Sequence, residues 1–158
     1  MEITRRQAIF GVLAVLVLAP FICYWIYDRF FKSEEDHIRE VLAAGAQGLR
    51  ERSPSAVAAV LSEDFRGPEN IDRAEAERLV YYLLREYREV QVTITPEPVV
   101  VALDSPVLAT ARFKADVKGK PDDSEQWKDF ASRYTSLKAT FKKTDRRWLI
   151  SRVELEKP

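Results

Sequence analysis

The sequence predicts an α+β domain, with three helices followed by an antiparallel sheet, behind an N-terminal membrane-spanning helix. Three observations lead to this prediction. Residues 7–27 contain no charged side chain, apolar residues recur at helical spacing between residues 34 and 89, and a strict alternation of apolar and polar residues then begins. We therefore expect an anchor over residues 1–32 and a single domain over residues 33–158.

Residues 7–27 are long enough to cross a membrane, because a rise of about 1.5 Å per residue brings the run close to a hydrocarbon thickness of roughly 30 Å. Two other interpretations remain. Arg5 and Arg6 loosely match a twin-arginine export signal, and Cys23 suggests a bacterial lipoprotein. No small-residue cleavage site follows the arginines, and bulky side chains precede Cys23, so we expect an uncleaved signal anchor.

The charges on either side of this run predict its orientation. Arg5 and Arg6 abut the run, whereas Glu34, Glu35 and Asp36 follow it, together with a few basic residues. Because basic residues are retained on the cytoplasmic side, the paired arginines favour a cytoplasmic N-terminus. We expect a single-pass protein of the bacterial inner membrane with an extracytoplasmic domain.

The composition excludes several classes of site. The chain has 25 basic and 25 acidic residues, so it lacks the basic excess typical of nucleic-acid-binding proteins. Cys23, the single cysteine, lies in the apolar run, so the domain has no disulfide and no cysteine-based metal site. His37 is the single histidine and has no second histidine to complete a metal site. We expect no nucleic acid, no metal and no cofactor.

Start signals and apolar spacing predict the three helices. Ser53 before Pro54 is typical of an N-cap followed by proline at the first helical position, and Asp72 with Glu75 has capping-box spacing. The predicted helices cover residues 33–52, 53–64 and 72–89. The buried stripe predicted for the third helix comprises Ala76, Leu79, Val80, Leu83 and Tyr87.

Alternation after residue 89 predicts a sheet. The predicted strands cover residues 90–95, 99–103, 107–118, 134–143 and 148–155, with a polar loop at residues 119–125. The inward-facing side chains predicted for the last three strands are Val107, Ala109, Ala111, Phe113, Ala115, Val117, Leu137, Ala139, Phe141, Leu149, Val153 and Leu155.

The order of these elements and three stretches of sequence resemble a known fold. The stretches are IREVLAAGAQGLRERSPSAVAAVLSEDF at residues 38–65, RAEAERLVYYLLREY at residues 73–87 and WLISRVEL at residues 148–155. Over about residues 34–156 the chain resembles the nuclear transport factor 2-like (cystatin-like, SnoaL-like) cone-fold superfamily. The resemblance implies a curved sheet wrapped around a long helix to form a cup. The superfamily contains isomerases, dehydratases, cyclases and epoxide hydrolases as well as non-catalytic binding modules, so the resemblance alone does not choose a function.

The predicted lining of the cup favours a non-catalytic domain. The resemblance implies that enzymes of this fold carry acids, bases or histidines inside the cup, whereas the inward positions predicted here carry no ionisable group. A register shift of one residue would turn polar side chains inward. A SnoaL-like isomerase, dehydratase or hydrolase, with Tyr134, Asp116 or His37 in the cup, is therefore the alternative.

Two groups of side chains are candidates for binding. Arg78, Tyr81, Tyr82 and Arg85 fall on one side of the third helix and are predicted to contact a protein partner in the cell envelope, because tyrosine and arginine are enriched at contact sites. The other interpretation is that the rings cover the first two helices. The pocket-mouth candidates, which could instead cap the sheet edge, are Trp127, Phe130 and Tyr134.

The outer face of the sheet predicts a monomer or a weak dimer. Arg112, Lys114, Asp116 and Lys118 alternate with the inward residues of one strand, and this mostly basic face would oppose its own copy in a face-to-face dimer. Together, these features predict a single-pass membrane protein whose domain binds a protein partner or a small apolar ligand near the membrane.

Overall fold

The computed structural model describes residues 32–129 and 136–156, together with Pro20. The predicted span at residues 7–27, apart from Pro20, lies outside the described residues, as do Phe130 and Tyr134. Within the described ranges, no helix is both long and apolar enough to cross a membrane. The chain divides into two compact units, residues 1–34 and 35–158, and the second unit forms the fold described below.

The helices begin where the sequence signals predict. The Ser53 hydroxyl accepts a hydrogen bond from the Ala56 amide at 3.3 Å, and the Asp72 carboxylate accepts one from the Glu75 amide at 2.9 Å, so both predicted N-caps are confirmed. The described helices are α2 at Glu34–Arg50, α3 at Pro54–Ala59 and α4 at Arg73–Arg85, with a short 3-10 turn, η1, at Pro68–Asn70.

The predicted ends of the second and third helices are wrong. The second was predicted to reach residue 64, but α3 ends at Ala59, and Leu61–Arg66 form strand β1. Pairing of β1 with the last strand of the sheet, and burial of Leu61 and Phe65 in the core, outweigh the weak helical pattern there. The third ends at Arg85 rather than residue 89, since the next strand begins at Tyr87.

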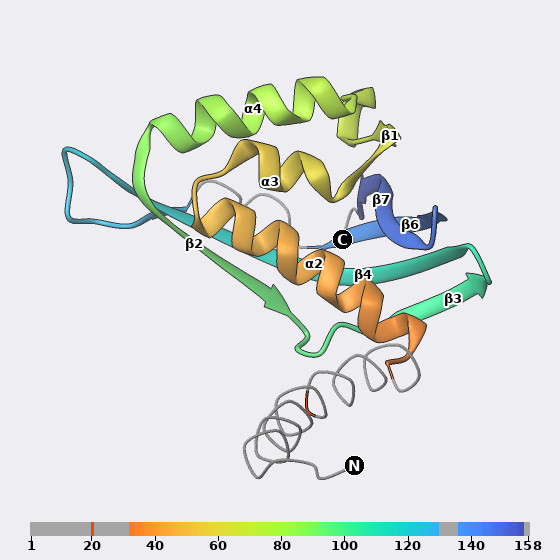
Figure 1. Cartoon of the computed structure of the whole chain (residues 1–158). Helices are drawn as coiled ribbons and strands as arrows, with labels where there is room; N and C mark the ends of the chain where they lie inside the picture. Colours follow the sequence, from red (N-terminus) through yellow and green to blue (C-terminus); the bar gives the residue numbers. More distant parts are fainter. Residues whose placement is uncertain (1–19, 21–31, 130–135, 157–158) are drawn as a thin grey trace, which may run out of the picture. The chain divides into compact units, whose positions relative to one another are not determined.

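The described strands form one mixed sheet. The prediction of a purely antiparallel sheet is therefore wrong. The main order is β1-β7-β6-β4-β2, with β3 and β5 also paired to β4, and the β1–β7 pair is parallel. In Figure 1 the long β4 passes behind α2, and α4 is drawn above α3. The remaining strands are β2 at Tyr87–Thr95, β3 at Val101–Ser105, β4 at Leu108–Pro121, β5 at Lys128–Asp129, β6 at Leu137–Thr144 and β7 at Arg147–Leu155.

Strand β4 runs further than predicted, through part of the expected loop. It ends at Pro121, and Val90 of β2 pairs with Gly119. Gly119 is required because the ring of Tyr87 covers it so closely that a Cβ there would overlap the ring. Val107, predicted to face inward, is 51% exposed because it lies in the turn before β4.

Strand β7 contains a bulge that changes which side chains face the core. Thr140 pairs with Arg152 but Phe141 pairs with Ile150, so Ser151 is the extra residue, and its hydroxyl donates to the Thr140 carbonyl at 3.1 Å. Trp148 and Ile150 are therefore buried, in place of the predicted Leu149. The predicted Leu155 is also wrong, since it lies at the strand end and is 38% exposed.

Apolar side chains of the described residues form the core between α2 and the sheet. The larger of two clusters joins α2 to the sheet and to β1, and among the described residues the only polar side chain that is buried is Ser62. Ser62 has no ionisable side chain, and the other buried side chains of the described residues are apolar. The buried members of this cluster are Ile38, Leu42, Leu61, Phe65, Val99, Ala109, Ala111, Phe113, Ala139, Phe141, Trp148 and Ile150.

Replacing Phe113 or Phe141 with alanine should lower the free energy of unfolding by roughly 3 to 5 kcal/mol, because both rings are buried and truncation leaves a cavity. Chemical denaturation of the full-length protein measures this change. Lys114→Ala is the control, since Lys114 is exposed on β4 next to Phe113. An unchanged midpoint for both phenylalanine variants would contradict their placement in the core.

Gly119→Ala should destabilise the domain by about 1 to 3 kcal/mol, because the added methyl group overlaps the Tyr87 ring. The same substitution in a Tyr87→Ala background should have little further effect, since the overlapping ring is gone. A double-mutant cycle of unfolding free energies tests this coupling. Additive effects would show that the ring does not enforce glycine at this position.

Candidate functional site

A groove of about 530 Å³ lies between α2, β2 and the loop that joins β2 to β3. This volume falls in the range of small-molecule sites, which are mostly apolar with a few polar groups at the edge. The apolar residues that line it are Leu42, Ala43, Ala46, Val92, Ile94, Pro96, Pro98 and Val99, and the polar ones are Arg39, Arg50, Gln91, Thr93 and Glu97.

One face of α2 supplies a wall of the groove. Arg39, Leu42, Ala43, Ala46 and Arg50 are spaced at i, i+3, i+4, i+7 and i+11, so they project from the same side of the helix. Leu42 and Ala46 are buried and form the floor, whereas Ala43 is exposed at the rim. The two arginines border the apolar middle of this wall.

The two arginines also hold α2 to the opposite wall. Arg39 Nε donates to the Val99 carbonyl at 2.9 Å, and its Nη1 pairs with the Asp36 carboxylate at 2.7 Å. Arg50 Nη2 donates to the Val92 carbonyl at 2.7 Å. Because β2 is an edge strand among the described strands, this bond satisfies a carbonyl that lies at the edge of the sheet.

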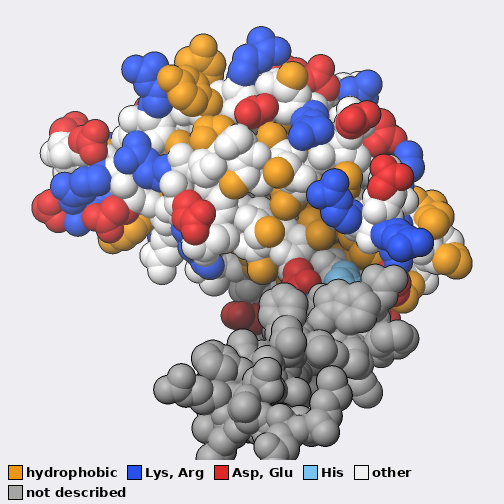
Figure 2. Space-filling view, in the orientation of Figure 1, with side chains coloured by type: hydrophobic (Ala, Val, Ile, Leu, Met, Phe, Trp, Pro, Cys, Tyr) orange, Lys and Arg blue, Asp and Glu red, His pale blue; other side chains and the backbone are white. Residues whose placement is uncertain are grey.

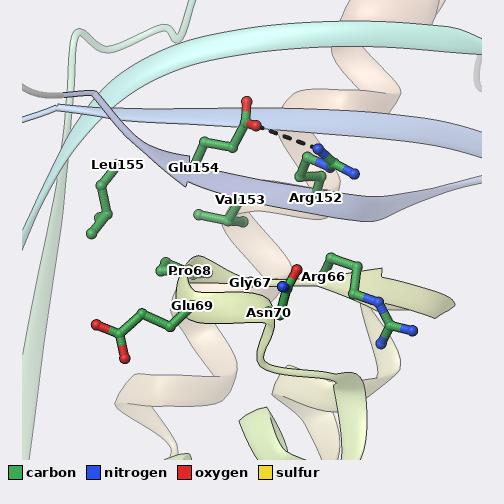
Figure 3. A pocket seen from close by; sticks show the side chains of 9 residues that line it. All are labelled: Arg66, Gly67, Pro68, Glu69, Asn70, Arg152, Val153, Glu154 and Leu155. Atoms are coloured by element: carbon green, nitrogen blue, oxygen red, sulfur yellow. Dashed lines mark ion pairs between the residues drawn. The ribbon is translucent and has the colours of Figure 1, made fainter.

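A second cavity, of about 360 Å³, lies between η1 and β7. Arg152 and Glu154 pair on its β7 side at 3.5 Å, while Figure 3 shows the side chains of Arg66 and Glu69 pointing apart on the other side. A third, on the outer face of the sheet, has a volume of about 460 Å³ and contains the Lys142–Asp64 ion pair at 3.0 Å. In each of these two cavities, an acidic side chain is paired with a basic one.

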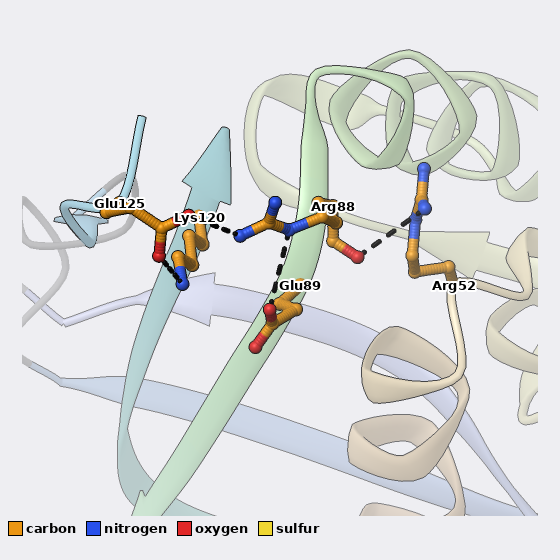
Figure 4. A network of polar contacts seen from close by, with 5 residues as sticks. All are labelled: Arg52, Arg88, Glu89, Lys120 and Glu125. Carbon is orange, nitrogen blue, oxygen red and sulfur yellow. Dashed lines mark hydrogen bonds and ion pairs between the residues drawn. The ribbon is translucent and has the colours of Figure 1, made fainter. Parts of the chain in front are cut away.

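A network of charged side chains fixes the start of β2 (Figure 4). The Glu125 carboxylate lies between Lys120 and Arg88, whose Nη2 is 3.1 Å away, and hydrogen bonds from Lys120 and then Arg88 hold the pKa of Glu125 below its ordinary value. Arg52 donates to the Leu84 carbonyl at 2.9 Å and so joins the end of α2 to α4. These contacts position the elements around the groove and contribute no group to it.

The partner-binding candidates on α4 form an exposed surface. Tyr81 and Tyr82 are 49% and 62% exposed, their ring centroids are 5.7 Å apart, and the Arg85 guanidinium lies 5.7 Å from the Tyr81 centroid. Leu79, predicted to be buried, is exposed beside them because Leu84 takes the core position instead. Figure 2 shows orange side chains bordered by blue ones over α4. About half of each ring or more is therefore open to solvent, and we call Arg78, Leu79, Tyr81, Tyr82 and Arg85 the α4 surface.

The structure does not bring the other candidates together. Trp127 precedes β5, is exposed, and lines none of the three cavities described above, and its two companions Phe130 and Tyr134 lie outside the described residues. Asp116 is exposed on β4, 3.7 Å from Lys118, while His37 is half-buried in the first turns of α2. Within the described ranges, no hydrogen bond or ion pair joins His37 to Asp116.

The groove residues Arg39 and Arg50 were missed by the sequence analysis. Their spacing with Leu42 and Ala46 is visible in the sequence and could have indicated a second apolar face on this helix. The opposing Val92 and Val99 could not be matched to that face, because only the folded chain brings residues 39 and 99 together.

Comparisons with known proteins support the fold. No protein-family model matches the sequence, and the comparison with curated proteins finds no match. Among solved structures, a protein from Novosphingobium aromaticivorans assigned provisionally as a scytalone dehydratase is similar, with a TM-score of 0.65, 16% identity and coverage of 75% of this chain and 80% of that one.

Two further solved structures are similar to this chain. A protein from Streptomyces avermitilis, assigned provisionally as a dehydratase of the nuclear transport factor 2-like family, gives a TM-score of 0.60 at 10% identity, over 76% of this chain and 92% of that one. A nuclear transport factor 2-like protein with a cystatin-like fold, from N. aromaticivorans, gives 0.58 at 19% identity, over 87% and 85%. At these identities the likeness concerns the fold, and the described domain therefore has the nuclear transport factor 2-like cone fold.

Proposed function

We propose that this protein is a non-catalytic binding domain that holds a small apolar ligand in the groove between α2 and β2. The observation that carries the proposal is the groove itself, whose buried apolar floor adjoins the apolar core of the domain. Catalysis by an acid or base requires a group of tuned pKa within hydrogen-bond reach of the substrate. No such group lies on the groove floor in the described part of the chain, so the arrangement supports binding over chemistry.

The proposal includes a membrane location, which rests on the sequence alone. The uncharged run at residues 7–27 anchors the chain in the bacterial inner membrane, with the domain on the extracytoplasmic side. The α4 surface would contact a protein partner in the cell envelope, because exposed tyrosine and arginine side chains are enriched at interfaces. The charged outer face of the sheet favours a monomer or a weak dimer.

A second candidate function is that of a dehydratase or a related enzyme. Two of the similar structures are assigned provisionally as dehydratases. These names favour an enzyme more than they favour a binding domain. The exposed position of Asp116 on β4 and the apolar character of the core are evidence against an enzyme. Fold is shared by catalytic and non-catalytic proteins, so the lining of the groove carries more weight here than the names.

Filling the groove should abolish ligand binding. Ala43→Trp places a large ring at the rim and should weaken binding of 6-phenylhexan-1-ol at least tenfold, as measured by calorimetry on the full-length protein in phosphatidylcholine nanodiscs, with empty nanodiscs as the blank. Ala44→Trp is the matched control, because Ala44 is the neighbouring exposed residue of α2 and does not line the groove. Equal affinity of both variants and the wild type would contradict the proposed site.

The anchor predicts firm association with the membrane. Alkaline carbonate extraction should leave the full-length chain in the membrane pellet, because an uncharged run of this length remains in the bilayer. Protease added to spheroplasts should digest the domain without lysis. Recovery of the chain in the supernatant, or a mature N-terminus downstream of Cys23, would contradict the anchor, and protection from protease until lysis would reverse its orientation.

A further inference from the structure

The two cations at the groove differ in how their charge is compensated. Arg39 is engaged twice, by the Asp36 carboxylate at 2.7 Å and by the Val99 carbonyl at 2.9 Å. Arg50 makes a single hydrogen bond, to the Val92 carbonyl at 2.7 Å, and no carboxylate of the described residues pairs with it. A guanidinium has five N–H donors, so most of those on Arg50 remain for a ligand.

The groove is therefore polarised along its length. Arg39 and Arg50 are eleven positions apart on α2, a separation of about 16 Å along the helix axis. Glu97, the acidic residue among those that line the groove, belongs to the loop whose Val99 carbonyl binds Arg39, and so lies toward the Arg39 end. Between the two ends the floor is apolar, with Leu42 and Val92 buried.

We propose that the groove takes an amphipathic monocarboxylate, an apolar chain or ring system that carries one carboxylate. This inference rests on the proposed function and names the class of ligand. The apolar body lies along the floor formed by Leu42, Ala46 and Val92, and the carboxylate lies on the free edge of the Arg50 guanidinium. Arginine suits this role because its planar fork binds a carboxylate through two parallel hydrogen bonds.

The position of Arg50 makes the preference for an anion depend on this side chain. Arg50 is in the last turn of α2, where the aligned peptide dipoles of the helix give a partial negative charge. An anion placed there without Arg50 would be repelled. Loss of the Arg50 charge should therefore remove the preference for a carboxylate, while the apolar contacts with the floor persist.

The test compares 6-phenylhexanoate with 6-phenylhexan-1-ol, which share the apolar body and differ in the charged group. Calorimetry on the full-length protein in phosphatidylcholine nanodiscs should show the wild type binding the acid at least tenfold more tightly than the alcohol at pH 7. Arg50→Gln should bring the two affinities together by weakening the acid alone, since glutamine can still donate to the Val92 carbonyl. Arg50→Lys should restore part of the preference.

Arg66→Gln is the control, because Arg66 is an exposed arginine of β1 that does not line this groove, and it should leave both affinities unchanged. Two results would overturn the inference: equal binding of acid and alcohol by the wild type, or an acid preference that survives Arg50→Gln. If Ala43→Trp still weakens binding of both ligands, the proposed function stands in either case. Absence of binding by either ligand would overturn the proposed function and the inference with it.

Discussion

The close packing of α2 on the sheet is the constraint on which the rest of this structure depends. Ala109, Ala111 and Ala139 are buried at the centre of the sheet, and Ala111 pairs with Ala139 across β4 and β6. Ile38 of α2 and Phe141 of β6 pack with these alanines in one cluster, where both side chains are fully buried. The groove described above lies along the side of α2 that faces β2, next to this core.

The groove and the edge strand are therefore parts of one arrangement. β2 is the last strand on its side of the main order, and the side chains of Val90 and Val92 pack with Ala46 of α2 in a second buried cluster. Arg50 joins the helix to the Val92 carbonyl above this cluster. The same residue thus closes the edge of the sheet and places a cation beside an apolar surface, which is the combination that a ligand with one charged end requires.

The sequence predicts those parts of the fold that depend on neighbouring residues. The caps at Ser53 and Asp72 and the buried alternation of β4 follow from local signals, and the structure bears them out. The short strand β1 could not be separated from the end of a helix, because its partner β7 lies far along the chain.

The bulge at Ser151 reverses the facing of β7 without any signal in composition or spacing. For the candidate site, the exposure of the α4 aromatic rings follows from helical periodicity. Leu79 was predicted to be buried, but it is exposed and Leu84 is buried instead. The groove forms where α2 lies next to β2, so it could not be predicted from the sequence of either segment alone.

The place of β7 in the sheet has a consequence for how the chain is made. β7 is the last of the described strands along the chain, yet it lies between β1 and β6, and Leu61 pairs with Ile150. Contacts of such long sequence separation form slowly, because the entropy of closing a long loop is lost before they contribute. The strands β1 and β6 therefore cannot be joined through β7 until residues 147–155 have left the ribosome.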